Sequence, residues 1–478
     1  MLDRLVELTA TPPQGCEHVE ARFVWRREQR LATRLGQVDE LGDDEAEGVG
    51  VRVRAGAAWG FASTHDLSRT GLERSLARAV AVARAAPPGP ASGLTPIVPA
   101  RGHWAGPCRQ DPFTVSLEDK LELLERADLA LQGDPRIART GATLRSVRTR
   151  TAFASSEGAA CTQEHTTCGA GVEAIATRDG EVQQRSYPGR HGAGTVAGGF
   201  EQATDLRLAE HAPRVSEEAV ALLSAPACAP GTGTIVLDGE QMALQLHESI
   251  GHALELDRMQ GGEAAYAGTS WVSPSDLGSL TYGAPGLAVT ADATLPGGLG
   301  SFGWDDEGVA ARRLELIRGG VLLEALSSRE SAAAAGLDAS GGCMRADGPS
   351  RQPIVRMTNV SFEPGTAGTL EELIADTDDG IYMETNRSWS IDDRRLHFQF
   401  ACELGREIRD GELRGLVRNP AYAGVTPRFW ASLDGVCSAP EWRLWGVLNC
   451  GKGEPGQRMQ VSHGTAPARF RGVSVGLA

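Results

Sequence analysis

Two histidines that lie five positions apart place the strongest local constraint on how this chain can fold. They begin and end the segment His247-Glu248-Ser249-Ile250-Gly251-His252. The residues before this segment predict a helix, because Asp238 can accept a hydrogen bond from the backbone of Gln241 in the first turn. Apolar side chains recur in this stretch at Met242, Leu244, Leu246 and Leu254. We therefore place both histidines on one helix.

The spacing of the two histidines conflicts with a regular helix if both are to reach one ion. Residues four positions apart lie about 40° apart around the helix axis, whereas residues five positions apart lie about 140° apart. The imidazoles converge only where the helix widens by one residue, as in a π-bulge, and Gly251 is where the backbone deforms at least cost. We predict such a bulge among Ser249, Ile250 and Gly251. Without it, the histidines are ordinary helix-surface residues beside a solvated Glu248.

A third ligand decides between these two interpretations, because a catalytic zinc site uses about three protein ligands and an open position. Cys450 is one candidate. It lies in the turn Asn449-Cys450-Gly451-Lys452, where the neighbouring lysine favours the thiolate. His463 is the other candidate, and it is either close to the site or an ordinary surface histidine.

The charge balance excludes one class of function. The chain has 62 acidic and 47 basic residues, a formal net charge of -15, so we expect neither a nucleic-acid partner nor an anionic membrane. No apolar run reaches the roughly 18 residues of a membrane-spanning helix. The segment Met1–Glu7 lacks the apolar run of a signal peptide. Nine cysteines without a CxxC pair are typical of reduced thiols, so we expect a cytoplasmic protein.

Hydrophobic periodicity and turn residues predict an α+β fold with two domains. Alternating residues predict a hairpin about Ala55-Gly56, and helical spacing predicts helices over 68–86 and 116–131. We expect an N-terminal mixed α/β half, with an antiparallel sheet and flanking helices, over residues 1–225. Residues 226–478 are expected to form a β-rich domain that carries the helix with the two histidines and the candidate cysteine ligand.

Four short segments, in this order along the chain, together resemble the TldD/PmbA family. They are residues 247–252, Trp304-Asp305-Asp306-Glu307-Gly308, Arg356-Met357-Thr358-Asn359 and Asn449-Cys450-Gly451-Lys452. The opening segments Gly48–Val53 and Trp59–Ala62 are similar to that family as well, so the likeness runs from about Val19 to the C-terminus. The family contains metal-containing TldD-like chains and PmbA (TldE)-like chains that have lost the site. This sequence resembles the TldD side, because it retains the two histidines, the glutamate and the cysteine.

The resemblance implies a zinc metallopeptidase. Its ligands here would be His247, His252 and Cys450, and Glu248 would be the general base that activates a metal-bound water. The family also implies a peptide substrate, drawn as an added strand into an enclosed cavity. The expected assembly is a dimer, formed either with a like chain or with a PmbA (TldE)-like chain. We place His463 among the candidate substrate-binding residues.

The sequence departs from the family pattern at two places, and these leave the substrate open. Residues Thr385–Arg395 stand where a Gly-rich loop is usual, and His463 stands where a small residue is expected. One alternative is a metal-dependent hydrolase that tailors a small amide or ester in a biosynthetic pathway, with Trp389–Arg395 narrowing the cavity. Another is a non-catalytic regulatory binding subunit, although such a module has no use for an intact set of metal ligands.

Other patterns are interpreted as structural. The acidic turn Asp305-Asp306-Glu307 is expected to be solvated, and Trp389 is expected to lie in the core. The segment from Gly446 to Lys452 matches most of a phosphate-binding loop, but Gly453 stands where that loop requires Ser or Thr. No GxSxG segment is present, which argues against a serine hydrolase.

Overall fold

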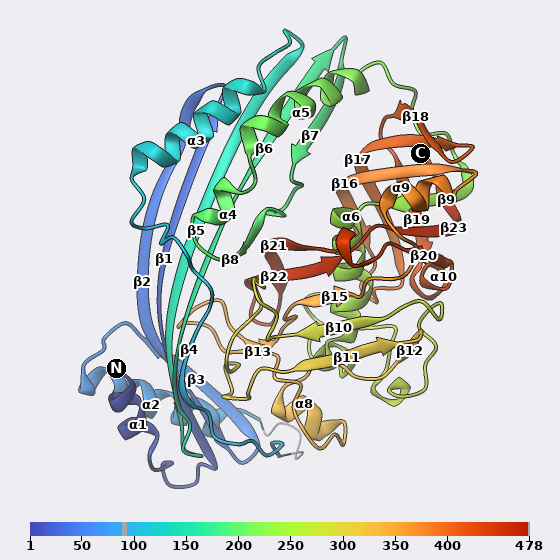
Figure 1. Cartoon of the computed structure of the whole chain (residues 1–478). Helices are drawn as coiled ribbons and strands as arrows, with labels where there is room; N and C mark the ends of the chain where they lie inside the picture. The colour runs from blue at the N-terminus through green and yellow to red at the C-terminus, as the bar shows by residue number, and fades with distance from the viewer. Residues whose placement is uncertain (88–92, 477–478) are drawn as a thin grey trace.

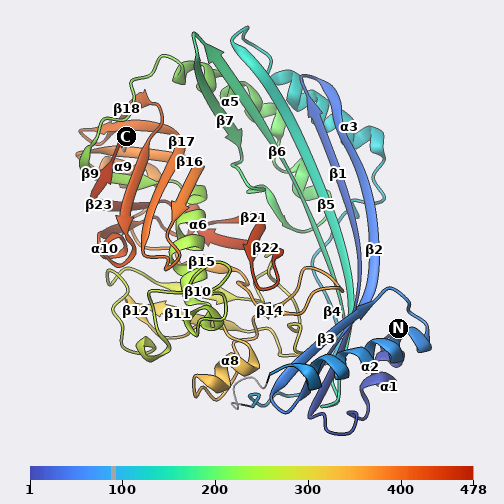
Figure 2. The same cartoon turned by 180° about the vertical axis from the view of Figure 1, so that it is seen from behind.

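An eight-stranded sheet of very long strands forms the N-terminal half of the chain in the computed structural model, which describes residues 1–87 and 93–476 (Figures 1 and 2). Its strand order is β3-β2-β1-β5-β6-β4, and β7 and β8 also pair with β6. Four strands have 17 to 19 residues, so each spans about 60 Å at about 3.3 Å per residue. The elements of this half are α1 (Leu2–Thr9), β1 (His18–Arg34), β2 (Gln37–Ala55), β3 (Ala58–Thr64), α2 (Arg69–Ala85), β4 (Arg101–Ala105), α3 (Leu117–Ala130), β5 (Ile137–Ser155), β6 (Ala160–Arg178), β7 (Glu181–Tyr187), β8 (Thr195–Ala197), α4 (Glu201–Thr204) and α5 (Leu208–Leu222).

The local elements predicted from periodicity are confirmed. The hairpin joins β2 to β3, with Ala55 paired to Ala58. Ser68 caps α2 by accepting a hydrogen bond from the backbone of Gly71, and Ser116 caps α3 by accepting one from Asp119. Each cap satisfies a backbone N–H group that the first helical turn leaves unpaired.

The two faces of the long sheet have different roles, because successive side chains of a strand point to opposite faces. On β1, the odd-numbered Val19 and Ala21 belong to a hydrophobic core beneath α1 and α2, near one end of the sheet. The odd-numbered Leu31 belongs to a second core beneath α3 and α5, near the other end. The even-numbered Arg22 and Arg26 instead line a cavity on the opposite face, together with residues of the C-terminal half. The long strands are therefore a platform with helices on one face and the C-terminal half on the other (Figure 1).

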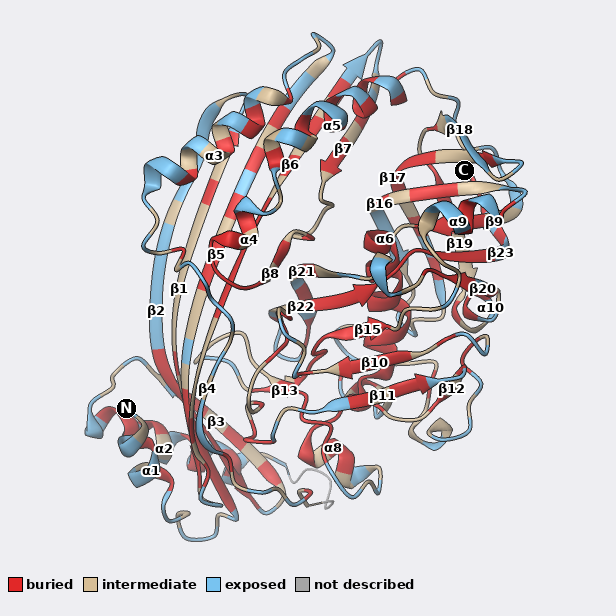
Figure 3. Ribbon diagram, in the orientation of Figure 1, coloured by how far each residue is buried: buried red, intermediate tan, exposed pale blue. Residues whose placement is uncertain are grey.

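The C-terminal half is rich in short strands, which confirms the expected α+β class. A seven-stranded sheet has the order β16-β9-β23-β19-β17-β18, with β20 on β23, and a second sheet has the order β12-β11-β10-β15. Helix α6 is completely buried and contacts β16, β15, β21 and β22 (Figure 3). No helix of the described residues is long and apolar enough to cross a membrane. The elements are β9 (Gly231–Leu237), α6 (Gly239–Leu246), α7 (Leu256–Met259), β10 (Val289–Asp292), β11 (Arg313–Arg318), β12 (Val321–Leu322), α8 (Arg329–Ala334), β13 (Met344–Arg345), β14 (Ile354–Val355), β15 (Val360–Phe362), α9 (Leu370–Ala375), β16 (Asp379–Ile391), β17 (His397–Arg409), β18 (Glu412–Val417), β19 (Ala421–Val425), α10 (Thr426–Ala431), β20 (Leu433–Val436), β21 (Arg443–Lys452), β22 (Gln457–Thr465) and β23 (Ala468–Val475).

None of the sheets in residues 1–87 and 93–476 combines strands from both sides of residue 226. The division into domains 1–225 and 226–478 is consistent with this arrangement and remains our proposal.

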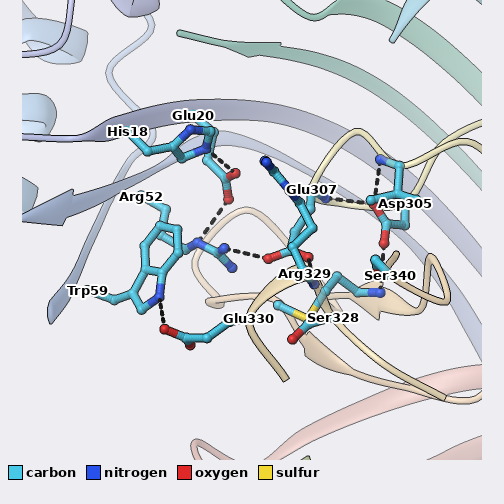
Figure 4. A network of polar contacts seen from close by, with 12 residues as sticks. His18, Glu20, Arg52, Trp59, Asp305, Glu307, Ser328, Arg329, Glu330 and Ser340 are labelled. Carbon is cyan, nitrogen blue, oxygen red and sulfur yellow. Dashed lines mark hydrogen bonds and ion pairs between the residues drawn. The ribbon is translucent and has the colours of Figure 1, made fainter. Parts of the chain in front are cut away.

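A buried network of ion pairs joins the two halves (Figure 4). Arg52 of β2 lies between Glu20 of β1, at 2.9 Å, and Glu307 of the C-terminal half, at 2.7 Å. Arg329 at the start of α8 pairs with Glu157 at 2.6 Å. Buried charges are tolerated only when they are paired and hydrogen-bonded, and Arg52 and Glu307 meet this condition across the contact between the two halves.

The expectation that the turn Asp305-Asp306-Glu307 is solvated is wrong. Asp305 and Glu307 are only 3% and 2% exposed. The Asp305 carboxylate accepts hydrogen bonds from the backbone N–H groups of Glu307, Val309 and Met344, and Asp306 pairs with Arg22 of β1. The turn is buried because its carboxylates bind backbone donors and arginines that are distant in the sequence.

Candidate metal centre

The helix that carries the two histidines widens at the predicted position. Asp238 caps α6 by accepting a hydrogen bond from Gln241 N at 2.8 Å. A π-helical turn follows from His247 to Gly251, and the His252 N–H bonds to the His247 carbonyl, five residues back. This i to i−5 bond supplies the extra residue that turns His252 toward His247, and their ring centroids lie 4.8 Å apart. The predicted bulge is confirmed.

The reason for glycine at position 251 differs from the one expected. Gly251 has φ −52° and ψ −61°, which is ordinary right-handed helical backbone open to any residue. A Cβ atom at this position would lie 2.2 Å from Met357 Sδ. A larger residue at position 251 would therefore displace the Met357 side chain, which packs directly against the widened turn, whereas the backbone conformation itself does not require glycine.

Three buried side chains meet at this turn. His247 and His252 come from the helix, and Cys450 comes from β21, at a bulge in its pairing with β22. Their candidate ligand atoms all lie within 4.8 Å of one another, and Cys450 Sγ is 3.6 Å from His252 Nε2. A tetrahedral zinc ion with ordinary bond lengths holds a sulfur and a nitrogen about 3.5 Å apart. The donor set of two imidazoles and one thiol therefore fits zinc in its chemistry, and the spacing of Cys450 and His252 fits as well.

The surroundings of Cys450 favour the form of the thiol that binds a metal. Burial by itself would raise the pKa of the Cys450 thiol, but the His247 imidazole and the Arg356 guanidinium hold that pKa well below its ordinary value. Burial would likewise lower the pKa of His247, yet the Cys450 thiolate raises it above its ordinary value. Because the thiolate is the form that binds metals, this lowered pKa favours metal binding by Cys450.

Each candidate histidine ligand is fixed by a hydrogen bond on its far side. His252 Nδ1 lies 3.0 Å from the Glu255 carboxylate, which in turn lies 3.3 Å from the Lys452 ammonium group. His247 Nδ1 lies 2.7 Å from His463 Nε2. Such partners set the tautomer and ring orientation of a ligand histidine. Both Nε2 atoms remain for the metal. The sequence analysis missed Glu255, although its i, i+3 spacing from His252 could have pointed to this pair. It expected Lys452 to favour the Cys450 thiolate, but the Lys452 ammonium group instead pairs with carboxylates, and Arg356 is the cation that lowers the pKa of Cys450.

His463 contacts the candidate ligand His247, but it does not line the cavity beside the three donors. Its imidazole is fully buried between His247 and the Val360 carbonyl, which is 2.8 Å from His463 Nδ1. The structure therefore places His463 behind a candidate ligand, and we propose a different role for it below.

A cavity of about 390 Å³ opens beside the three donors. Glu248 lies on its wall, and the Arg395 guanidinium lies 2.5 Å from the Glu248 carboxylate. Arg395 belongs to the turn between β16 and β17, the segment in which the sequence departs from the TldD/PmbA pattern that it otherwise resembles. The backbone of this turn is held by Thr426, whose hydroxyl donates to the Arg395 carbonyl and whose N–H donates to the Leu396 carbonyl, both at 2.8 Å.

The N-terminal half also contributes to the cavity, through His191. The His191 ring packs edge-on against Trp389, with centroids 5.0 Å apart, and its Nε2 atom has no hydrogen-bond partner among the described residues. The His191 carbonyl accepts a hydrogen bond from Leu448 N, two residues before Cys450. Trp389 is 40% exposed, so the expectation that it lies in the core is wrong. It is exposed because it forms a wall of the cavity.

The widened helix thus brings two oriented imidazoles and a carboxylate together with the Cys450 thiol of β21, the kinds of group that a metal-dependent hydrolase uses. The chain matches the three domain models of the PmbA/TldA metallopeptidases: domain 1 over residues 19–84, the central domain over 110–223 and the C-terminal domain over 230–477. The chain therefore belongs to the PmbA/TldD family, and the resemblance noted in the sequence is confirmed.

Relatives of known name agree with this assignment. A metalloprotease of Methanothermobacter thermautotrophicus is 31% identical over 96% of this chain and 95% of its own length. A zinc metalloprotease TldD homolog of Saccharolobus solfataricus is 25% identical over 52% of each chain. The crystal structure of TldE from Thermococcus kodakarensis shares the fold, with a TM-score of 0.72 and 15% identity over 96% of this chain and 97% of that one.

Proposed function

We propose that this chain is a zinc-dependent peptidase that cleaves unfolded or small peptides in the cavity beside His247, His252 and Cys450. The observation that carries the proposal is the position of Glu248, whose carboxylate shares one cavity with the three donors. Support for zinc comes from the spacing of the donors and from the name of the Saccharolobus relative. We keep the cytoplasm as the proposed compartment.

Each residue has a distinct task in this proposal. The two imidazoles and the thiolate hold the ion, which when bound lowers the pKa of a coordinated water and polarises the peptide carbonyl. Glu248 takes the proton of the attacking water and passes it to the nitrogen of the leaving amine. Arg395 orients the Glu248 carboxylate through their ion pair. His191 and Trp389, from the two halves of the chain, contact the bound peptide.

The Glu248→Gln substitution tests this proposal. The amide keeps the size of the side chain but cannot accept a proton, so zinc content should stay at one per chain while turnover falls by about 10²–10⁴-fold. Elemental analysis and cleavage of a fluorogenic peptide library measure the two effects. Glu371→Gln, an exposed site on α9, is the matched control and should leave both unchanged. Full peptidase activity of Glu248→Gln would sink the proposal.

The same assay addresses the alternative substrate. A cavity of about 390 Å³ with Trp389 and Arg395 on its wall is also large enough for a small amide or ester. If the wild-type chain hydrolyses small acyl amides in a Glu248-dependent manner and leaves the peptide library intact, the tailoring hydrolase replaces the peptidase.

A further inference from the structure

His463 is a fully buried histidine with a defined partner on each ring nitrogen. It lies on β22, with Nδ1 2.8 Å from the Val360 carbonyl oxygen and Nε2 2.7 Å from His247 Nδ1. The His247 and His463 rings are nearly perpendicular, at 86°. His463 does not line the cavity of the candidate centre, so its contact with His247 is the feature that needs a function.

The Val360 carbonyl determines where the protons lie in this pair. A carbonyl oxygen only accepts hydrogen bonds, so His463 Nδ1 carries the hydrogen. In a neutral imidazole the other nitrogen then has the lone pair, and His463 Nε2 accepts from the His247 Nδ1–H group. In the neutral form of His247 the Nε2 atom then carries the lone pair, and this is the form that binds a metal. One backbone carbonyl thus fixes the tautomers of two histidines.

The two candidate histidine ligands are supported by groups of different charge. His252 is backed by the Glu255 carboxylate, whereas His247 is backed by a neutral imidazole. A carboxylate partner makes a ligand histidine more basic and adds negative charge near the ion. The Cys450 thiolate already supplies one such charge directly.

We infer that His463 is a positioning residue of the metal centre, which holds His247 in the metal-binding tautomer without adding charge. The inference rests on the proposed metal site. Its test measures metal affinity and not hydrolysis, so it can fail while the proposed peptidase activity stands.

Two substitutions of His463 separate its two hydrogen bonds. In His463→Gln the amide oxygen lies about where Nε2 was and still accepts from His247. In His463→Asn the shorter side chain retains the bond to the Val360 carbonyl but does not reach His247. Zinc affinity is measured by competition with a chromophoric chelator, and the cobalt(II) form is followed by its thiolate-to-metal absorption. We expect the Asn variant to lose about 10–100-fold in zinc affinity and the Gln variant to bind nearly as tightly as the wild type.

A control addresses general damage to the strand. Ser361→Ala removes the 3.2 Å hydrogen bond from Gly464 N to Ser361 Oγ. This buried bond is made by the residue next to His463, and its loss leaves the contact between His463 and His247 in place. This variant should keep wild-type zinc affinity. Wild-type affinity in His463→Asn, or equal losses in the Asn and Gln variants, would overturn the inference. If His463→Asn does not fold, the Gln variant decides, because a tenfold or greater loss there contradicts the role as acceptor.

Discussion

Lys452 is a fully buried lysine whose ammonium group lies among three carboxylates behind the metal centre. Its Nζ atom is 2.8 Å from Asp257, 3.3 Å from Glu255 and 3.4 Å from Glu263. Glu263 has a second cation beside it, Arg258, at 3.4 Å. Replacing Lys452 with methionine keeps the apolar stem and removes the charge, so Asp257 and Glu255 would lose the lysine they pair with and Glu263 would keep only Arg258.

The expected cost follows from the burial of this cluster. Removing one partner of a buried ion pair destabilises a protein by about 3–5 kcal/mol. For a domain of this size each kcal/mol lowers Tm by about 2–4 °C, so we expect the C-terminal half of Lys452→Met to unfold roughly 6–20 °C earlier at pH 8. Because Glu255 holds His252, the variant should also bind zinc more weakly.

The loss of stability in Lys452→Met should depend on pH in a defined direction. Burial raises the pKa of Asp257 and of Glu263 above their ordinary values, even with Lys452 present. A carboxyl group with a raised pKa binds its proton more tightly in the folded chain, so stability rises as the pH falls through the folded pKa. Loss of Lys452 raises these pKa values further. The Tm difference from the wild type should therefore shrink between pH 8 and pH 5.

Thermal unfolding of the zinc-free protein, followed by circular dichroism at both pH values, checks this prediction. Lys120→Met is the matched control, because Lys120 is also buried but contacts the Gln29 amide and forms no ion pair with any described carboxylate. A Tm loss in Lys452→Met no larger than in Lys120→Met, or one that does not shrink on acidification, would refute this reasoning.

Two further predictions concern the widened turn and the assembly. Gly251→Ala should lower the free energy of unfolding by about 1–3 kcal/mol and weaken zinc binding, because the new Cβ overlaps Met357 Sδ. Adding Met357→Ala to the same chain should restore zinc binding. The control Gly286→Ala, whose Cβ meets nothing within 4 Å, should change neither Tm nor zinc content. We also expect a dimer, either of this chain or with a co-produced PmbA (TldE)-like chain, because a strand edge that accepts a peptide needs shielding. A monomeric mass by light scattering, together with full peptidase activity, would contradict the enclosed cavity.

Local physics made part of the centre predictable from the sequence. The five-residue spacing of His247 and His252 requires a widened turn, because the angle per residue of a helix is fixed. The Asp238 cap and the hairpin at Ala55-Gly56 depend only on neighbouring residues, and they too are as expected. The turn with its neighbouring lysine distinguished Cys450 from the other thiols, but only the family resemblance chose it over His463 as the third ligand.

The parts that were missed depend on contacts between distant segments. Arg395 lies 147 residues from Glu248 in the sequence, and Lys452 lies 197 residues from Glu255. His191 enters the cavity from the other half of the chain. Neither periodicity nor composition specifies which turn of a sheet faces which helix. The same limit explains the buried turn at Asp305, whose burial depends on arginines of β1 and β2 that the local sequence does not contain.

The loop that carries His191 links the cavity to the docking of the two halves. Ala193 and His191 accept hydrogen bonds through their carbonyl oxygens from Gly446 N and Leu448 N of β21, at 3.2 and 3.1 Å. A Cβ at Gly446 would lie 2.4 Å from the Thr195 carbonyl oxygen, so only glycine permits this close approach. The strand that presents Cys450 is thus bonded to the N-terminal half immediately beside the metal centre. The ion pairs of Arg52 with Glu307 and of Arg329 with Glu157 join the same two halves at another place, so the cavity wall and these pairs belong to one contact between the halves.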